Sequence, residues 1–520
     1  MKQTIKCLIA AFAAMLMSVA AFAQVTTSAL GGRVVDANGE PIIGAAVVAT
    51  HEPSGTVYGV ITNNDGRYAI NGMRSGGPYK VEFSCLGYQS LAYTDVTLQL
   101  AETTALNGEL NEDSEMLGEA MVIAAAASKF AAEKTGAATN ISGSQITSLP
   151  TVSRSITDVT RLSPYGGNGM SFAGSDGRTA NFTVDGANFN NNFGLNDGLP
   201  GGGSPISIDA IEEMQVVISP YDVRQTNFIG GGVNAITKSG TNKFRGTAYV
   251  YHQNQDLHGD TIDGTQIDGA RAKDMNTTYG FTLGGPIIKN KLFFFVNAEL
   301  TKKPSVVNRW RGTSVVDENG NGVGDAGNYI SRTTLADLER VSKFVKEKYG
   351  YDTGSWTAFP ADESNRKILA RIDWNINDNH KLALRYNHTL NRRWSSPNGT
   401  SMDGGSRLAS YRMSKNSMSY ANSMYSQDNL VNSISLDLNS RFSDNLSNQL
   451  LVTYSQLNDV RGSTSDLFPF IDIKKDGDNY LSLGYELFTL NNGVHNTVAT
   501  FKDDLTYYAG NHKIVFGLSA

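Results

Sequence analysis

Apolar and polar residues alternate through much of the second half of the chain. The alternation is clear in four segments, at 294–301, 368–375, 382–387 and 434–439. A period of two predicts β-strands with one apolar and one polar face. About nine such strand candidates follow Phe244, so this half is predicted to be a large antiparallel β-structure.

The connections between these strand candidates alternate in length. Short turns lie at 377–380, 443–445 and 510–512, and long polar loops lie at about 303–365, 390–428 and 458–496. Short turns at one end and long loops at the other are typical of outer-membrane β-barrels, which separates this reading from a soluble sandwich with the same alternation. The first long loop also has a helical period, which predicts a short helix at 335–349.

The first third of the chain has a different organisation, with short strands and frequent turns. Residues 29–108 contain the tight-turn sequences Asn38-Gly39 and Asn64-Asp65-Gly66, and residues 79–84 alternate with period two. Several short strands at close spacing indicate a β-sandwich, of the seven-stranded type.

The amino terminus is predicted to be an export signal at residues 1–23. Two lysines precede an apolar run at 8–21, and Ala21-Phe22-Ala23 provides the small residues of a cleavage site. The mature chain is therefore expected to begin at Gln24. No later stretch contains the roughly 18 consecutive apolar residues that a membrane helix requires.

Composition excludes several classes of protein. The chain carries 44 basic and 50 acidic residues, a net charge of −6, whereas a nucleic-acid binder shows a basic patch. Cys85 is the sole cysteine after the signal, so no intrachain disulfide or thiolate metal site is expected. Zinc-protease, phosphate-loop and nucleophile-elbow motifs are absent from the sequence. We therefore expect neither an enzyme nor a cofactor.

One weak metal candidate lies in the first long loop. Asp317, Asn319 and Asn321 match the opening of a calcium-binding loop, and Asp325 follows them. The twelfth position of that loop needs a bidentate glutamate, and the sequence has Asn328 there. A plain polar turn is therefore favoured, and no metal site is predicted.

Specific motifs in the first third resemble a known domain family. They are Gly32-x-Val34-x-Asp36, Gly39-x-Pro41-x-x-Gly44-Ala45-x-Val47, Asp65-Gly66-x-Tyr68 and Gly87-Tyr88. Together they resemble the carboxypeptidase regulatory-like domain, over about 75 residues. The resemblance implies a non-catalytic β-sandwich, which we place at 24–110.

Three segments in the middle of the chain are distinctive: 182–186, ending in Asp-Gly, 206–216 and the glycine-rich 230–242. They resemble the plug domain of TonB-dependent outer-membrane receptors, in their Oar-like branch and less closely in the SusC-like branch. The following segment, 282–295, resembles the first barrel hairpin of the Oar-like family. The resemblance implies a plug at 139–242 and a transmembrane barrel from 243 to 520.

A short extended segment lies in the acidic and alanine-rich linker at 111–138. Glu119, Ala120, Met121, Val122 and Ile123 resemble a TonB box, with Ala120 and Met121 departing from the usual valines. An extended segment of this kind can add as a strand to the edge of a partner's sheet. The position between a sandwich and a plug favours this role over that of a core strand.

The resemblance implies a receptor of the Gram-negative outer membrane that takes up a ligand with energy from a TonB-type complex. A surface lipoprotein partner is left open, and so is the ligand, which the sequence allows to be a peptide, a glycan, a metal chelate or a protein. The alternatives are a structural or adhesive surface receptor that transports nothing, and a soluble periplasmic β-protein. The last residues, 517–520, lie within a strand pattern and lack a closing aromatic, so we expect a longer natural chain that this sequence truncates, with a degenerate gene as the alternative.

Overall fold

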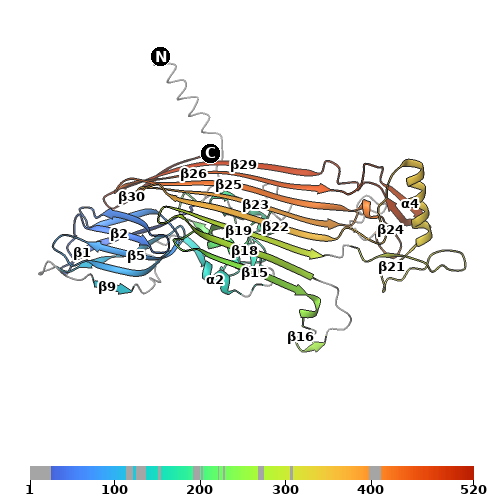
Figure 1. Ribbon diagram of the computed structural model, residues 1–520, viewed down its shortest axis with the longest axis horizontal. Coiled ribbons are helices and arrows are strands. Elements are labelled where there is room, and N and C mark those ends of the chain that lie inside the picture. Colours follow the sequence, from blue (N-terminus) through green and yellow to red (C-terminus); the bar gives the residue numbers. More distant parts are fainter. Residues whose placement is uncertain are drawn as a thin grey trace, which may run out of the picture.

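The computed structural model describes residues 25–112, 121–124, 136–149, 151, 154–190, 199–200, 203–220, 222–225, 229–259, 261–266, 275–304, 308–397 and 412–520. Strands dominate these residues and build a sandwich, a small mixed sheet and a long antiparallel sheet (Figure 1). The predicted fold class is confirmed: mainly β, with an N-terminal sandwich, a plug and a partial barrel. Among the described residues the sandwich has nine strands where seven were expected, because the short segments 103–105, 108–110 and 121–124 also pair with its sheets. The predicted export signal at 1–23 and most of the 111–138 linker lie outside the described residues.

The N-terminal sandwich consists of two sheets that share one apolar core. One sheet has β1 (Ser28–Asp36) between β4 (Arg67–Met73) and the short strands β7 (Thr103–Ala105) and β8 (Gly108–Leu110). The other has the order β3 (Thr56–Ile61), β2 (Ala46–His51), β5 (Gly76–Ser84), β6 (Leu91–Leu98) and β9 (Met121–Ala124). Alternate residues of β5, such as Tyr79, Val81 and Phe83, are fully buried in the core, as period-two burial requires.

The plug is a five-stranded sheet with short helices. Its order is β10 (Gly136–Ser142), β13 (Ile211–Pro220), β14 (Gly232–Thr237), β11 (Asn181–Val184) and β12 (Ala187–Asn188). Helices α2 (Gly143–Ser148) and α3 (Ile156–Thr160) each begin with a capping box, and η1 (Gly177–Thr179) and η2 (Ile208–Ala210) are 3-10 turns. All six residues of β14 are buried, because this strand lies inside the sheet and is covered on both faces.

The long sheet contains nine antiparallel strands, the number expected from the alternation pattern. In order they are β15 (Arg245–Asn254), β18 (Met275–Ile288), β19 (Leu292–Pro304), β22 (Asp362–Asn375), β23 (His380–Ser395), β25 (Tyr425–Ser443), β26 (Leu446–Gly462), β29 (Gly493–Ala509) and β30 (His512–Ser519). The plug packs against one face, and Phe295, Leu369 and Val431 of the sheet join the plug core. Along β22 the side chain of Trp374 is 40% exposed while Asp373 is 3% exposed, so the apolar face points outward, toward lipid.

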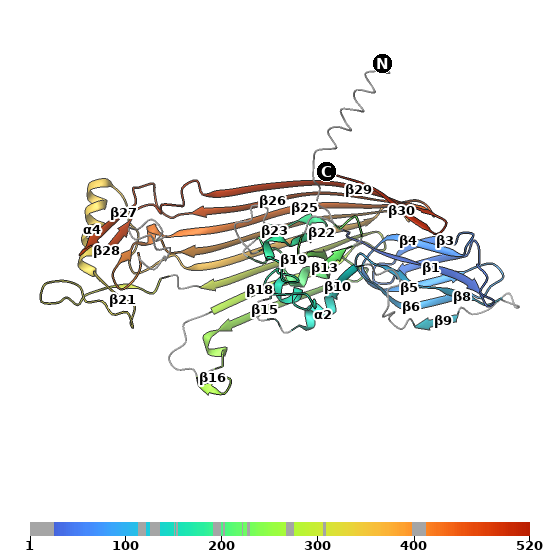
Figure 2. The same ribbon diagram turned by 180° about the vertical axis from the view of Figure 1, so that it is seen from behind.

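The long loops gather at the end of the sheet opposite the sandwich (Figures 1 and 2). They form β20 (Arg311–Thr313), β21 (Ile330–Thr334), α4 (Leu335–Tyr349), β24 (Met418–Ser419), η5 (Ala421–Ser423), β27 (Ile471–Lys475) and β28 (Asp478–Leu483), and near β15 also η3 (Gln255–Leu257), β16 (Thr261–Ile262) and β17 (Thr265–Gln266). Helix α4 confirms the prediction for 335–349. Thr334 caps its first turn, and Gly350 ends it with a φ of 71°. Among the described residues, no helix combines the length and the apolar character that crossing a bilayer requires.

The sandwich packs against the short-turn end of the long sheet. Asn71 on β4 donates from Nδ2 to Oγ of Ser447 at 3.1 Å and accepts at Oδ1 from the hydroxyl of Tyr508 at 3.0 Å. Asn375 on β22 donates to Oγ1 of Thr56 at 2.9 Å. Because long barrel loops face the outside of the cell, the sandwich lies on the periplasmic side.

Candidate functional site

The structure places the TonB-box-like segment beside the sandwich. Glu119 and Ala120 lie outside the described residues, whereas Met121–Ala124 forms β9. This strand runs parallel to β6, and the register pairs Leu91 with Met121 and Thr94 with Ala124. The segment is therefore extended and paired through its backbone, at the end of the five-stranded sheet (Figure 2).

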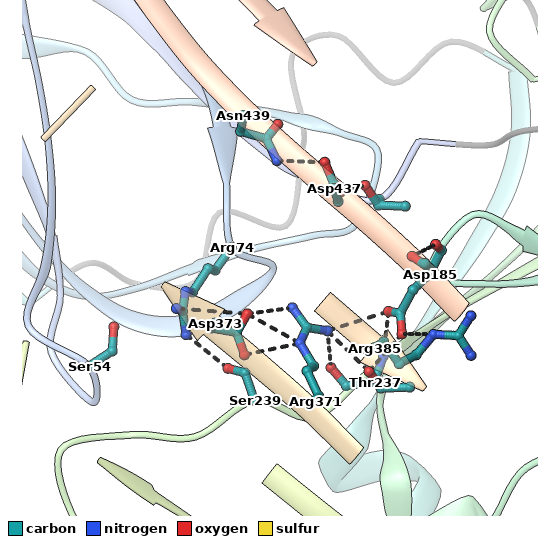
Figure 3. Close-up of polar contacts among 12 residues, drawn as sticks. Ser54, Arg74, Asp185, Thr237, Ser239, Arg371, Asp373, Arg385, Asp437 and Asn439 are labelled. Atoms are coloured by element: carbon teal, nitrogen blue, oxygen red, sulfur yellow. Dashed lines mark hydrogen bonds and ion pairs between the residues drawn. The ribbon is translucent and has the colours of Figure 1, made fainter. Parts of the chain in front are cut away.

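A buried ion-pair cluster joins the plug to the long sheet, and Asp185 is at its centre (Figure 3). Asp185 follows β11 in the Asp-Gly turn, with a φ of 45°, and its carboxylate accepts from both N and Oγ1 of Thr237, at 3.0 and 2.7 Å. From the sheet, Nε of Arg385 lies 3.1 Å from Oδ2 of Asp185, and Nη1 of Arg371 lies 3.4 Å from Oδ1. One carboxylate of the plug therefore pairs with two arginines of the long sheet.

The cluster continues from Arg371 to the sandwich. Arg371 donates from Nη1 to the carbonyl oxygen of Thr237 at 2.8 Å, and its Nη2 lies 2.8 Å from Oδ1 of Asp373. Arg74, which directly follows β4, reaches the same Asp373 oxygen at 3.9 Å and donates to Oγ of Ser239 at 2.9 Å. All three bodies therefore meet in one polar network, so a displacement of the plug must break contacts with both the sheet and the sandwich.

A cavity of about 730 Å³ lies beside this network, between sandwich, plug and sheet. Charged side chains line it, including Arg74, Glu212, Arg245, Lys381 and Asp437. The start of the described chain also passes here: Thr26 donates to the carboxylate of Asp437, and the carbonyl of the buried Val25 accepts from Nδ2 of Asn234 on β14 at 2.5 Å. The first described residues, Val25 and Thr26, therefore help to hold the plug against the sheet.

The plug is also joined to the sandwich through Glu213 on β13. Its Oε1 accepts from the backbone nitrogen of Leu100 at 3.0 Å and from Nδ2 of Asn140 at 3.2 Å, and Oε2 accepts from the hydroxyl of Ser75. Burial raises the pKa of the Glu213 carboxyl to about 8, although these hydrogen bonds oppose the shift. The junction therefore contains a carboxyl that titrates near neutral pH.

A second cavity, of about 300 Å³, lies on the opposite side of the plug, near the strand ends that lead into the long loops. We call it the outer cavity. Hydroxyl, amide and aromatic side chains provide much of its lining, with a few charged groups. The guanidinium of Arg154 from the plug lies 4.0 Å from the ring centroid of Tyr251 and forms an ion pair with Asp209. The cavity therefore combines a cation, an aromatic wall and many hydrogen-bonding groups.

The wall of this outer cavity is held to the plug by a buried ion pair. Nζ of Lys367 lies 2.7 Å from Oε1 of Glu299, and it donates to Oγ of Ser204 in the plug at 2.9 Å. Glu299 also accepts from Oγ of Ser207 at 2.8 Å and from the hydroxyl of Tyr249 at 2.9 Å. Every charged atom of the pair is therefore compensated, which buried charges require.

The candidate calcium residues form two separate turns. The Oδ1 atom of Asp317 accepts from the backbone nitrogens of Asn319 and Asn321, at 3.0 and 2.7 Å. Asp325 instead accepts from the backbone nitrogen of Gly327 at 2.9 Å. Both carboxylates thus satisfy backbone donors of their own turns, as aspartates in tight turns commonly do.

The sequence identifies the segments that join the plug to the long sheet and the sandwich, but it does not identify the roles of the charged residues in them. In the sequence, Asp185 belongs to the Asp-Gly segment and Glu213 to the 206–216 segment, and the family resemblance assigns neither residue a role of its own. Arg371 and Asp373 are polar positions of an alternating strand. The sequence does contain one signal of their role. Arg371 and Asp373 carry opposite charges and lie two residues apart, on the face of the strand that points toward the plug.

Two family profiles match the sequence. The outer membrane beta barrel domain matches residues 236–520, which is more than half of the chain, and the carboxypeptidase regulatory-like domain matches residues 29–111. The TonB-dependent transporter Oar of Myxococcus xanthus is 27% identical over 394 residues, which cover 72% of this chain and 34% of Oar. The TonB-dependent receptor SusC of Bacteroides thetaiotaomicron is 36% identical over 118 residues, or 23% of this chain and 10% of SusC.

Among solved structures, the outer membrane transporter YddB from Escherichia coli superposes with a TM-score of 0.47 at 14% identity, over 73% of this chain and 47% of YddB. The chain spans about a third of the length of Oar and about half of YddB. Because one barrel profile covers more than half of its length, the chain belongs to the outer membrane beta barrel domain family of the Gram-negative outer membrane, and it is similar to the two TonB-dependent proteins described above.

Proposed function

We propose that the full-length protein is an energised transporter, which binds a solute from outside and releases it into the periplasm without chemical change. A TonB-type complex would pull on the segment near Glu119 to Ile123 and so move the plug. The observation that carries this proposal is the attachment of the plug: polar contacts centred on Asp185 hold it to the sheet wall. These contacts lie beside an apolar contact in which Phe295, Leu369 and Val431 of the sheet join the plug core, so movement of the plug would have to separate both.

We infer that the outer cavity beside Arg154 receives the solute. Its lining supports a polar ligand that forms many hydrogen bonds and offers a face to Tyr251, which a peptide or a glycan fragment would satisfy. A metal chelate or a protein segment of similar polarity would also fit. A surface lipoprotein that delivers the ligand to the long loops is part of the same proposal.

The domain limits used here, 24–110, 111–138, 139–242 and 243–520, are also proposals. Limited proteolysis of the full-length protein is expected to cut first within 111–138, because linkers between domains are the usual sites of cleavage. Mass spectrometry of the fragments tests this, and first cleavage inside 139–242 would contradict it.

Proline at Val122 tests the transport proposal. Proline removes a main-chain donor, so it should block strand addition to the partner, whereas Val122→Ala keeps the backbone intact. Cells that express the full-length protein would be given labelled pools of peptides, glycan oligomers and ferric chelates, and surface binding and accumulation would be measured separately. We expect Val122→Pro to abolish accumulation of the bound pool while binding persists. Unchanged accumulation would show that the segment does not couple, and binding without accumulation in every variant, wild type included, would favour a non-transporting receptor.

A further inference from the structure

Strand β9 occupies the position of an edge strand on the sandwich (Figure 1). Without it, the sheet would have the order β3-β2-β5-β6, and β6 would be the edge. The register pairs four consecutive residues, Met121 to Ala124, with Leu91 to Thr94. The pairing is parallel, although each of the other pairings in this sheet is antiparallel.

Strand β6 is firmly fixed in the sandwich. Leu91 is buried in the sandwich core, and β6 is hydrogen bonded on its other side to β5, which contains the fully buried Phe83. Among the described residues, strand β9 pairs with the sandwich over four residues. If the contact breaks, β9 is therefore the element that leaves, and β6 remains in the sandwich.

The chain on the plug side of β9 is long enough for such a release. Residues 125–135 connect β9 to β10, and an extended chain of that length spans up to roughly 40 Å. Strand β9 can therefore separate from β6 while β10 stays in the plug sheet.

We propose that the β6 edge of the sandwich is a docking site for the coupling strand, and that the TonB-type partner must displace β6 to bind it. This inference rests on the coupling role of the 119–123 segment proposed above. Strand addition uses main-chain donors and acceptors, and those that face β6 are already paired. The sandwich thus competes with the energy-transducing partner for the same strand and limits how often it is available.

A reversible cross-link between β6 and β9 tests this competition. Ala92 and Val122 are paired neighbours, and Cα atoms on adjacent strands lie within the range that a disulfide spans. The double variant Ala92→Cys/Val122→Cys would be made in the full-length protein with Cys85, and any cysteine beyond residue 520, replaced by serine, so that no other thiol competes. Ala29→Cys/Thr103→Cys is the matched control, since these residues are paired between β1 and β7 of the same sandwich.

The probe is the purified periplasmic C-terminal domain of the host's own TonB-type protein, and the measurement is its affinity for the purified full-length receptor. We expect the Ala92→Cys/Val122→Cys protein to cross-link under mild oxidation in isolated outer membranes. The oxidised form should bind the probe at least tenfold more weakly than the reduced form, and reduction should restore binding. The control pair should show no difference between its two forms.

Two results would overturn the proposal. One is failure of the β6–β9 pair to cross-link under conditions in which the control pair does. The other is equal affinity of the oxidised and reduced forms, which would mean that the partner adds to β9 without displacing β6.

Val122→Pro separates these failures from failure of the coupling role. If proline abolishes probe binding while the cross-link has no effect, the coupling role stands and the competition falls. If neither change affects binding, both fall.

Discussion

The Asp185 carboxylate of the plug lies 3.1 Å from Nε of Arg385 on strand β23 of the long sheet. Both residues are buried, and Arg385 is 2% exposed. Each charge therefore depends on the other, because neither has enough access to water to be solvated. Separation of the plug from the sheet would therefore require new partners for both side chains, so this pair contributes to holding the plug in place.

The first prediction concerns this lock. Asp185→Asn should weaken the attachment of the plug by about 3–5 kcal/mol, because it leaves the buried Arg385 without its counter-charge. Bilayer conductance of the reconstituted full-length protein, measured as urea is increased, should show channel opening at a lower urea concentration. Asp176→Asn is the control, since Asp176 pairs with Arg178 in an exposed turn. Equal behaviour of the two variants would contradict a special role for Asp185.

The second prediction is a pH dependence at the sandwich–plug junction. The pKa of the Glu213 carboxyl is raised from 4.5 to about 8, so the folded protein binds this proton more tightly than the unfolded chain does. The stability from this group is greatest below pH 4.5, falls as the pH rises from there, and is lost by about pH 8. Glu213→Gln should remove this contribution to the change of folding stability with pH. The variant should also be more stable than the wild type at pH 8.

The measurement is the melting temperature at intervals between pH 5 and pH 8.5. Glu82→Gln serves as the control, because Glu82 forms a half-exposed pair with Lys80. A slope that persists in Glu213→Gln would assign the pH dependence to another group.

The third prediction concerns close backbone packing where the plug joins the sheet. A Cβ atom on Gly240 would lie 2.4 Å from the carbonyl oxygen of Phe294 and 2.7 Å from that of Gly285. Neither backbone oxygen can move freely, so Gly240→Ala should cost about 1–3 kcal/mol. The amount of assembled protein in the outer membrane, measured as the heat-modifiable form on a gel, should be lower for Gly240→Ala than for the wild type. Gly259→Ala is the matched control, because nothing lies within 4 Å of a Cβ there, and equal assembly of both variants would refute the steric argument.

The fourth prediction tests the lipid-facing surface. Ile434 is 44% exposed and lies in the middle of β25, whereas the exposed Ile287 is close to a short turn. Lysine on the lipid face costs about 2–4 kcal/mol at the bilayer midplane and about 0–1 kcal/mol near the interface. Unfolding of the full-length protein from lipid vesicles should therefore be much easier for Ile434→Lys than for Ile287→Lys. Similar effects would indicate that this face does not contact lipid.

The fifth prediction concerns calcium. Because Asp317 and Asp325 already accept from backbone donors of their own turns, calcium is expected to bind weakly or not at all. Isothermal titration of the full-length protein should show no saturable binding below the millimolar range. Sub-micromolar binding that Asp317→Asn removes would contradict this.

Much of the fold could be predicted from the sequence because it follows from local repetition. The alternation at 368–375 determines a strand, and Ile372 and Trp374 point outward because their neighbours Arg371 and Asp373 cannot face lipid. Helix α4 likewise follows from a 3.6-residue period and from its capping residues, Thr334 and Gly350. The Asp-Gly turn at Asp185 was also readable, because its glycine suits positive φ.

The tertiary structure alone decided which distant residues meet. Asp185 and Arg385 are 200 positions apart, and Glu213 meets Leu100 across more than 100 positions, so no local pattern links them. The same holds for β9: its sequence determined an extended segment, but an extended segment can pair with any free edge, and its pairing with β6 depends on where the sandwich lies. Periodicity is a property of neighbours along the chain, whereas burial of charge and choice of strand partner are properties of the folded arrangement.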